Sequence, residues 1–212
     1  MTEASKLRRE YEGEPLDEAS SSADPVELFG GWFEAALAAG IDDANAMVLA
    51  TADAAGRPSA RVVLLKGYGL DGFTFYTNYA SRKAAELAVN PRAELLFYWP
   101  ALHRQVRIAG TAARVPPEDS DAYFASRPRG AQLGALASPQ SAVVSGRAEL
   151  EERFRRAEAE HAGREVPRPP GWGGYLLRPD EFEFWQGRGN RLHDRLRYRR
   201  AEGGWVRERL AP

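Results

Sequence analysis

The sequence predicts a mainly β protein, a closed or nearly closed antiparallel barrel with helices packed outside it. Short runs rich in β-branched and aromatic residues recur along the chain, and turn residues such as Asp71-Gly72 separate them. The gaps between these runs are too short for the crossovers that parallel strands need, so the strands are expected to pair antiparallel. The early strands are expected at 46–52, 59–68, 73–78, 93–99 and 104–115.

Helices flank these strands. Asp24 is a candidate N-cap with Pro25 at the first helical position, apolar residues follow at helical spacing, and Gly40 can end the helix. Because the later strand-like runs must still bury one face, we expect them to join the first sheet. Further helices are expected at 81–90, 117–126 and 148–162, and the later strands at 175–178, 181–186, 191–199 and 205–210.

The chain divides into two unequal parts. Residues 1–23 are polar and end in a serine-rich stretch, which predicts a mobile N-terminal arm. Residues 24–212 contain no repeat and no composition shift, so they are expected to form a single domain.

Composition excludes several classes of protein. The 212 residues include no cysteine, which rules out a disulfide framework and a thiolate site. With 29 Lys+Arg against 30 Asp+Glu, the chain lacks the positive excess of a nucleic-acid binder. The start lacks the apolar core of a signal peptide, and no run approaches the roughly 20 apolar residues of a membrane span. We therefore expect a cytoplasmic protein that binds neither nucleic acid nor membrane.

The segment 67–72 matches the G-x-G-x-x-G pattern of dinucleotide-binding proteins. That fingerprint must open a helix, whose N-terminus holds the pyrophosphate. Here a strand-like run, 73–77, follows instead. The pattern therefore predicts a hairpin loop.

Two segments combine cations with a plausible anion site. Ser81-Arg82-Lys83 begins a predicted helix, where free N–H groups, the helix dipole and two cations would suit a phosphate. From this segment alone, a serine cap followed by solvated charges is the favoured interpretation. Arg61 and Lys66 lie at the two ends of an apolar strand, five positions apart. Residues so spaced face opposite sides, so the two charges could serve one ligand only with a bulge or by touching different parts of it.

A third basic segment is Arg191-Leu192-His193-Asp194-Arg195. On a strand, Arg191, His193 and Arg195 share one face, and burying three such groups is costly unless an anion lies against them. An exposed basic edge strand, which guards against aggregation, is the alternative. The isolated His103 and His161 lack acidic or histidine partners at ligand spacing, so no metal site is expected.

Taken together, the chain closely resembles the pyridoxamine 5′-phosphate oxidase family. The matching segments run in family order over nearly the whole chain: LRREY, RVVLLK, FYTN, SRK, RQV, SRPR, QLGA, PQS, WGGY, EFWQG, RLHDR and the terminal ERLAP. The resemblance implies an FMN-binding split β-barrel that forms a homodimer with FMN at the subunit interface. It also implies that FMN is held by Arg61, Val62, Val63, Leu64, Leu65, Lys66, Tyr76, Thr77, Arg82, Lys83, Gln105, Gln140, Ser141, Trp185 and Arg195.

For the substrate, the resemblance implies a phosphate site and a reaction site. The substrate-binding residues would be Arg8, Tyr11, Lys66, Tyr123, Arg127, Arg191, Leu192 and His193, with Arg191 and His193 as the catalytic neighbours. Arg8 and Tyr11 match positions that close over the substrate, which would make the arm a lid. The reaction implied is oxidation of pyridoxamine or pyridoxine 5′-phosphate to pyridoxal 5′-phosphate by hydride transfer to FMN, with O2 reduced to hydrogen peroxide.

Two positions depart from the family pattern. Ala131 stands where a serine commonly contacts the substrate phosphate, and Leu136 replaces the tryptophan of the QLGAW segment. A hydroxyl hydrogen bond to an anion contributes about 1.5–3 kcal/mol, so its loss would weaken binding without abolishing it. The alternatives are a related FMN oxidase acting on another aromatic substrate, such as a phenazine precursor, and a non-catalytic flavin- or pyridoxal-phosphate-binding protein.

Overall fold

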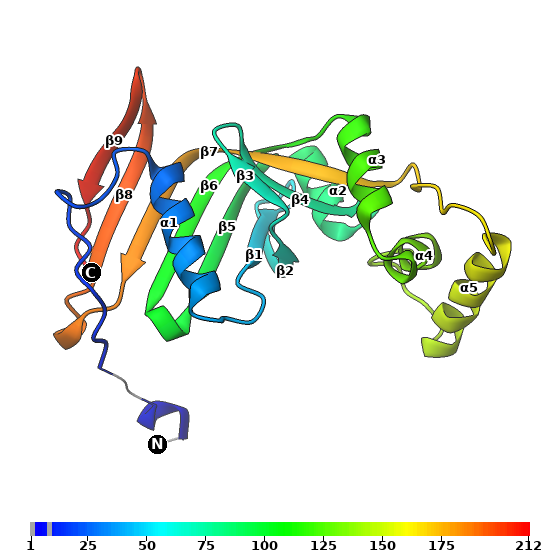
Figure 1. The fold of residues 1–212 in the computed structure, drawn as a ribbon, viewed down its shortest axis with the longest axis horizontal. Coiled ribbons are helices and arrows are strands. Elements are labelled where there is room, and N and C mark those ends of the chain that lie inside the picture. The colour runs from blue at the N-terminus through cyan, green and yellow to red at the C-terminus, as the bar shows by residue number, and fades with distance from the viewer. Residues whose placement is uncertain (1–2, 8–9) are drawn as a thin grey trace.

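A computed structural model describes residues 3–7 and 10–212 of the chain (Figure 1). The helices are α1 (Pro25–Ala38), α2 (Arg82–Val89), α3 (Pro117–Ser126), α4 (Arg129–Ala137) and α5 (Arg147–Glu160), with short 3₁₀ turns at Glu3–Lys6, Pro100–Leu102 and Gly189–Arg191. The strands are β1 (Ala46–Ala52), β2 (Pro58–Leu64), β3 (Gly67–Gly69), β4 (Gly72–Asn78), β5 (Arg92–Trp99), β6 (Arg104–Arg114), β7 (Trp172–Gln186), β8 (Asp194–Ala201) and β9 (Gly204–Arg209).

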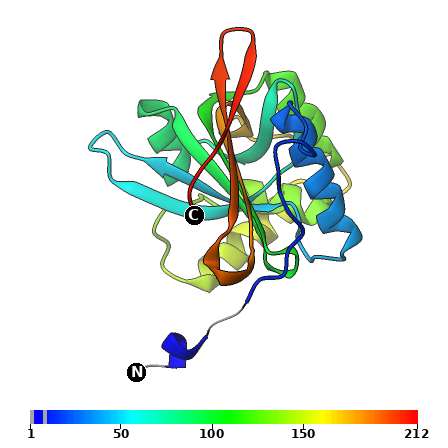
Figure 2. The same cartoon turned by 90° about the vertical axis from the view of Figure 1, so that its left-hand side faces the viewer.

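The strands form one curved antiparallel sheet in the order β2-β1-β5-β6-β7-β4-β3, with β8 and β9 added beside β7. After β2 the chain crosses from its pairing with β1 to a pairing with β4, where the Lys66 amide donates a hydrogen bond to the Thr74 carbonyl oxygen at 2.9 Å. The first and sixth strands of the order thus meet, and the sheet curls into a barrel (Figures 1 and 2). The predicted antiparallel barrel is therefore confirmed.

Helix α1 closes one side of this barrel (Figure 1). The Asp24 carboxylate accepts from the Val26 amide at 2.8 Å, and Pro25 starts the helix, as the sequence predicts. Phe29 is fully buried and meets the rings of Phe73 and Phe97 at 4.9 and 5.0 Å. Burying each such ring contributes roughly 1.5–3 kcal/mol, so the aromatic core ties the helix to the sheet.

A second, smaller hydrophobic core lies at the N-terminal end of β7. It consists of Phe124, Leu133, Ala157, Val166 and Trp172, and it holds α3, α4 and α5 against the start of that strand. Figure 1 shows these helices gathered at the end opposite β8 and β9. The molecule is therefore long, and β7 joins its two ends.

Two predicted strand assignments were wrong, and one helix was not predicted. The strand expected at 59–68 is interrupted after Leu64, where the chain leaves β1 to meet β4. The strands expected at 175–178 and 181–186 are one strand, β7, because the sheet absorbs Pro179 at a bulge opposite Gly110. Helix α4 was missed, since Gly130 and Gly134 hide its pattern.

The G-x-G-x-x-G segment forms the turn between β3 and β4, with Tyr68 paired to Phe73. The predicted hairpin is confirmed. Across residues 3–7 and 10–212, no helix has the length and apolar character that crossing a membrane requires.

We expect Gly110→Ala to lower the free energy of unfolding by about 1–3 kcal/mol, because a Cβ at Gly110 would lie 2.2 Å from the Arg178 carbonyl oxygen. Gly31→Ala is the matched control. It adds a methyl group to open space on helix α1 and should raise the free energy of unfolding by about 0.5–1 kcal/mol. Urea unfolding at one protein concentration measures both, and equal stability of the two variants would contradict the packing described for the bulge.

Candidate functional site

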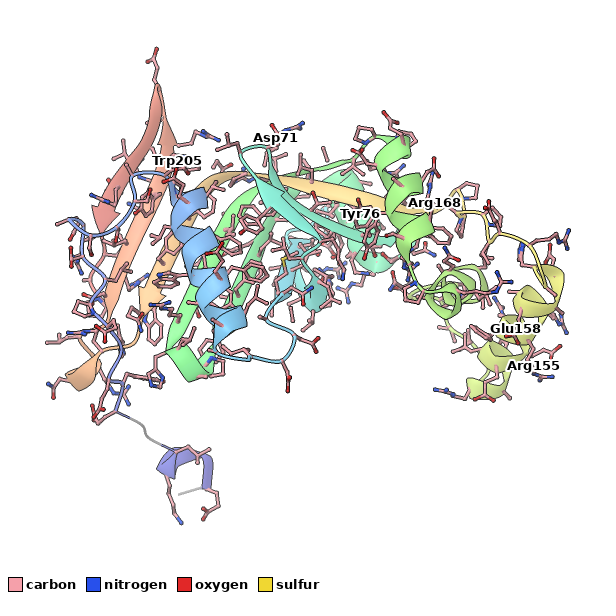
Figure 3. All side chains as sticks on the ribbon, in the orientation of Figure 1. Asp71, Tyr76, Arg155, Glu158, Arg168 and Trp205 are labelled. Carbon is pink, nitrogen blue, oxygen red and sulfur yellow. The ribbon has the colours of Figure 1, made fainter. Side chains whose placement is uncertain are left out.

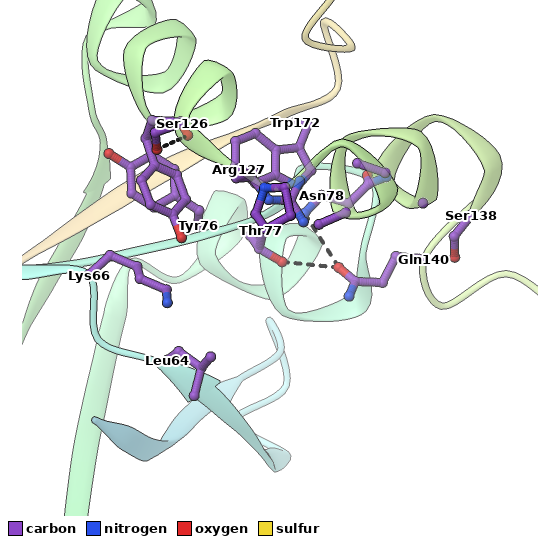
Figure 4. A pocket seen from close by; sticks show the side chains of 15 residues that line it. Leu64, Lys66, Tyr76, Thr77, Asn78, Ser126, Arg127, Ser138, Gln140 and Trp172 are labelled. Carbon is purple, nitrogen blue, oxygen red and sulfur yellow. Dashed lines mark hydrogen bonds between the residues drawn. The ribbon is translucent and has the colours of Figure 1, made fainter. Parts of the chain in front are cut away.

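A pocket of about 640 Å³ opens between β4 and the helices α3 and α4 (Figure 4). Its volume lies within the roughly 300–1,000 Å³ of small-molecule sites. We call it the β4–α3 pocket. It brings together seven residues that the sequence nominated from five separate segments: Leu64, Lys66, Tyr76, Thr77, Tyr123, Arg127 and Gln140.

Lys83 is a buried cation behind this pocket. Its ammonium group donates to the Thr77 hydroxyl at 3.1 Å, the Gln140 carbonyl oxygen at 3.2 Å and the Ser81 hydroxyl at 3.3 Å. Burial, together with the nearby Arg61, lowers the pKa of Lys83. Within the described part of the chain, Lys83 has only neutral acceptors and no carboxylate, which is the environment that an added anion would stabilise.

The loop after α4 completes this corner. Gln140 also accepts from Thr77 at 3.0 Å, and the Ser141 hydroxyl accepts from the Arg82 amide at the start of α2 at 3.2 Å. Ser81 is the N-cap residue, yet its hydroxyl serves Lys83 instead of capping the helix. The interpretation of Ser81-Arg82-Lys83 as a capped helix with solvated charges is therefore wrong for Lys83.

Arg61 lies beside α2, where a buried carboxylate holds it. Its Nη2 lies 3.2 Å from Glu86 Oε2, while Arg82 Nε lies 2.8 Å from Oε1 of the same residue. Burial alone would raise the pKa of Glu86, but hydrogen bonds from Ser59, Thr51 and Arg82 outweigh it and lower the pKa to about 2. Glu86 thus remains ionised and fixes both guanidinium groups. Arg61 is held beside α2, whereas Lys66 lines the β4–α3 pocket, so the two cations have different surroundings.

An aromatic stack forms one wall of the β4–α3 pocket. The rings of Tyr76 and Tyr123 are nearly parallel with centroids 3.9 Å apart, and Trp172 continues the stack 5.5 Å from Tyr76. The Arg127 guanidinium lies 4.7 Å from the Trp172 ring, and burial lowers its pKa. Its Nη1 is buried and has no hydrogen-bond partner among the described residues. Arg127 is therefore a half-buried cation, and its buried Nη1 lacks an anionic partner.

A second group of nominated residues lies at the far end of β7. Trp185 pairs across the sheet with Gln105 on β6 and Arg195 on β8, and the His193 ring lies 4.8 Å from the Trp185 ring. We call Gln105, Trp185, His193 and Arg195 the β7–β8 cluster. The Arg188 amide donates to His193 Nδ1 at 3.1 Å. Because an amide can only donate, the neutral His193 ring must carry its proton on Nε2.

The strand prediction for Arg191 was wrong. Residues 189–191 form a 3₁₀ turn, and β8 begins only at Asp194. Asn190 and Arg191 have positive φ, 56° and 60°, which breaks the alternation of side chains. Arg191 and Leu192 are therefore exposed at the tip of the loop that connects β7 and β8.

The N-terminal arm lies against this cluster. The Tyr11 ring contacts the rings of His193 and Trp185 at 5.5 and 5.7 Å, edge to face. Leu16 is buried; its amide donates to Asp194, and its carbonyl accepts from Arg209 at 2.9 Å. Arg8, the other nominated lid residue, lies outside the described residues. Closure of the arm over a substrate stays a prediction.

The β4–α3 pocket and the β7–β8 cluster are far apart in one chain. Tyr76 pairs with Gly174 near the start of β7, and Trp185 lies eleven residues farther along the same strand. At about 3.3 Å per residue, this separation is about 36 Å. Figure 3 shows Tyr76 beside α3, near the middle of the molecule, and Trp205 on β9, well away from it toward the left-hand side. One chain therefore does not bring all the nominated residues to a single site.

Sequence reasoning missed three residues around these sites. Trp172 belongs to the WGGY segment, so a signal existed, but no role was assigned to it. Glu183 begins the EFWQG segment, and it too was assigned no role. Glu86 carried no signal, because a carboxylate on a short helix is usually exposed. Among the described residues, no group of three or more His, Cys, Asp or Glu side chains could hold a metal ion.

Comparisons with known proteins converge on one family. The sequence model described as pyridoxamine 5′-phosphate oxidase matches residues 33–161, and the pyridoxine 5′-phosphate oxidase C-terminal dimerisation region matches residues 172–212. The pyridoxine/pyridoxamine 5′-phosphate oxidase of Rubrobacter xylanophilus is 60% identical over 206 residues, 97% of this chain and 95% of the relative. Its counterpart from Salinibacter ruber is 55% identical over 215 residues, the whole of both chains.

Two solved structures are similar to the whole fold. PhzG from Burkholderia lata, in complex with tetrahydrophenazine-1-carboxylic acid, has a TM-score of 0.89 and 32% identity, with 94% of this chain and 99% of that chain covered. A pyridoxamine 5′-phosphate oxidase-related, FMN-binding protein from Nostoc punctiforme has a TM-score of 0.68 and 23% identity, with 86% and 96% covered. The second supports the fold alone.

We expect Glu86→Gln to lower the free energy of unfolding at neutral pH by about 3 kcal/mol. The pKa of Glu86 is about 2 in the folded protein against an ordinary 4.5, so its contribution is complete above pH 4.5 and is lost as the pH falls toward 2. Denaturant unfolding of both proteins between about pH 6 and pH 3 checks this, and the gap should shrink on acidification. An unchanging gap would rule out the ionised, buried carboxylate.

Proposed function

The chain belongs to the pyridoxamine 5′-phosphate oxidase family, and we propose that it oxidises pyridoxamine and pyridoxine 5′-phosphate to pyridoxal 5′-phosphate with FMN as its cofactor. One observation carries the proposal. Arg127 is a half-buried cation that lines the pocket, and Lys83 is a buried cation that donates to the pocket residues Thr77 and Gln140. Within the described residues, neither has an acidic partner. Two phosphates, one from the cofactor and one from the substrate, would supply the missing anions.

The residues present fit FMN. Lys83, Arg82 and the α2 N-terminus offer cationic and N–H donors for its phosphate, and the pocket is large enough for part of a flavin. The residues that would hold it are Arg61 to Lys66, Tyr76, Thr77, Arg82, Lys83, Gln140 and Ser141 on the pocket side, and Gln105, Trp185 and Arg195 from the β7–β8 cluster. Arg61 would act mainly through its fixed position, since four protein acceptors already hold its Nη atoms.

The substrate phosphate would bind Lys66, Tyr123 and Arg127. The unpartnered Arg127 Nη1 supports this role, because a phosphate oxygen would satisfy it. Ala131 lines the same pocket without a hydroxyl, so the family's usual serine contact is missing here. Binding would then depend more heavily on Arg127.

Arg191 and His193 would act at the reacting end of the substrate. When bound, FMN supplies the two-electron acceptor for the substrate's 4′ carbon, and O2 takes those electrons onward to give hydrogen peroxide. The Arg188 amide holds His193 as the Nε2–H tautomer, so His193 presents a donor that orients the substrate. Tyr11, Leu192 and Arg8 would cover this end and exclude water.

The active unit would be a homodimer with FMN at the subunit interface. The match to a dimerisation region at residues 172–212 supports a homodimer. The outer face of the sheet supports it further, since Val62, Leu64 and Tyr98 are exposed there. Pairing the β4–α3 pocket of one copy with the β7–β8 cluster of the other would unite residues that one chain holds about 36 Å apart. A cytoplasmic location remains a prediction.

A second candidate is an oxidase of phenazine-type precursors. The close structural similarity to PhzG and the missing hydroxyl at Ala131 favour it. The arginine at position 127 favours the phosphorylated substrate instead, because an unphosphorylated precursor would not satisfy it. The relatives at 55–60% identity are named pyridoxine/pyridoxamine 5′-phosphate oxidases, which favours the same phosphorylated substrate.

Anaerobic mixing of the FMN-loaded protein with pyridoxamine 5′-phosphate tests the proposal. We expect the visible flavin absorbance to bleach and to return on admission of air, with hydrogen peroxide formed. The unphosphorylated amine is the matched control and should bleach the flavin about a hundredfold less efficiently, as expected for loss of charge-assisted hydrogen bonds. Absence of bleaching by the phosphorylated amine and by its alcohol analogue would refute the oxidase and leave a non-catalytic binder.

A further inference from the structure

Glu183 is a buried carboxylate in the middle of β7. It lies on the outer face of the sheet, only 5% exposed, between Arg107 on β6 and Arg195 on β8. Its Oε1 accepts from Arg195 Nε at 2.9 Å, and its Oε2 lies 3.1 Å from Arg107 Nη1. Both carboxylate oxygens are therefore occupied by guanidinium groups, and Glu183 cannot turn without leaving one of them unpaired.

The end of the chain holds the same arginine from a second side. Arg195 Nη1 donates to the Ala211 carbonyl at 2.7 Å, and the Leu210 amide donates to the Arg195 carbonyl at 3.0 Å. The Arg195 guanidinium is thus fixed at Nε by Glu183 and at Nη1 by Ala211. Its Nη2 has no protein acceptor among the hydrogen bonds of the described residues, which leaves that nitrogen for a ligand.

We propose that Glu183 and the Ala211 carbonyl are positioning groups for FMN, acting through Arg195. The inference rests on the proposed function, in which Arg195 binds FMN. A free arginine side chain loses rotamer freedom when it binds, and a side chain already held in place loses less. These contacts also give the ERLAP segment a role, because Leu210 and Ala211 both form hydrogen bonds with Arg195.

A purely structural role for Glu183 would have a different signature. Glu183 also pairs with Arg107, which in turn bonds Glu94, so its removal could simply weaken the sheet. In that case the stability of the protein would fall, but any change in FMN affinity would be the same with or without Arg195. A double-mutant cycle separates the two roles.

The experiment is FMN titration of the full-length protein after flavin removal, followed by quenching of flavin fluorescence. The proteins are the wild type, Glu183→Gln, Arg195→Ala and the double variant. We expect the dissociation constant to rise about tenfold in E183Q and about a hundredfold in R195A, with less than about a twofold further change when E183Q is added to R195A. Glu94→Gln is the matched control, since it removes the other carboxylate on Arg107 without touching Arg195, and it should leave FMN affinity unchanged.

Truncation after Leu210 keeps the inference testable if E183Q does not fold, because it removes only the exposed Ala211 and Pro212. It should weaken FMN binding several-fold in the wild type and not at all in R195A. Wild-type FMN affinity in both E183Q and the truncated protein would overturn the inference, as would an equal loss with and without Arg195. Failure of the proposed FMN site would look different, since the wild type itself would then take up no FMN. Failure of the oxidase activity alone would leave these FMN affinities unchanged.

Discussion

Strand β7 crosses the molecule without interruption for 15 residues, and it separates the two halves of the candidate site. Tyr76 and the β4–α3 pocket lie beside its first residues, and Trp185 with the β7–β8 cluster lies beside its last. A strand in a sheet cannot fold back on itself, so no rearrangement within one chain brings these ends together. The same strand provides the sheet onto which α3, β8 and the C-terminal residues pack. The proposal that a second copy completes the site thus rests on the length of one strand.

Buried charge organises each half in the same way. In both halves one buried carboxylate holds two guanidinium groups: Glu86 with Arg61 and Arg82, and Glu183 with Arg107 and Arg195. Lys83 and Arg127 differ, because neither has an acidic partner among the described residues. Burying a cation without an anion is costly, whereas a fixed ion pair is tolerated. The paired arginines are therefore held in fixed positions, and the two cations without an acidic partner mark where the phosphate groups would bind.

Local patterns in the sequence were enough to predict most of the fold. The cap at Asp24-Pro25, the turn at Asp71-Gly72 and the alternation of the early strands each rest on neighbouring residues, so they could be recognised one segment at a time. The start of β8 could not, because Asn190 and Arg191 adopt positive φ only as part of a loop fixed by long-range contacts. The site residues were nominated by resemblance, but spacing gave no hint that Glu86 and Glu183 are buried. Nor could it show that the nominated residues divide into two distant groups, since that depends on sheet topology.

Complementation between two inactive variants tests the shared site most directly. Arg127→Ala alters the β4–α3 pocket and His193→Ala alters the β7–β8 cluster, and each variant alone should have little oxidase activity. Co-expression with two different affinity tags allows the mixed dimer to be purified. If each site combines the two halves from different copies, the mixed dimer contains one intact site and one doubly altered site, and it should recover about half of the wild-type activity. A mixed dimer no more active than either parent would contradict the account.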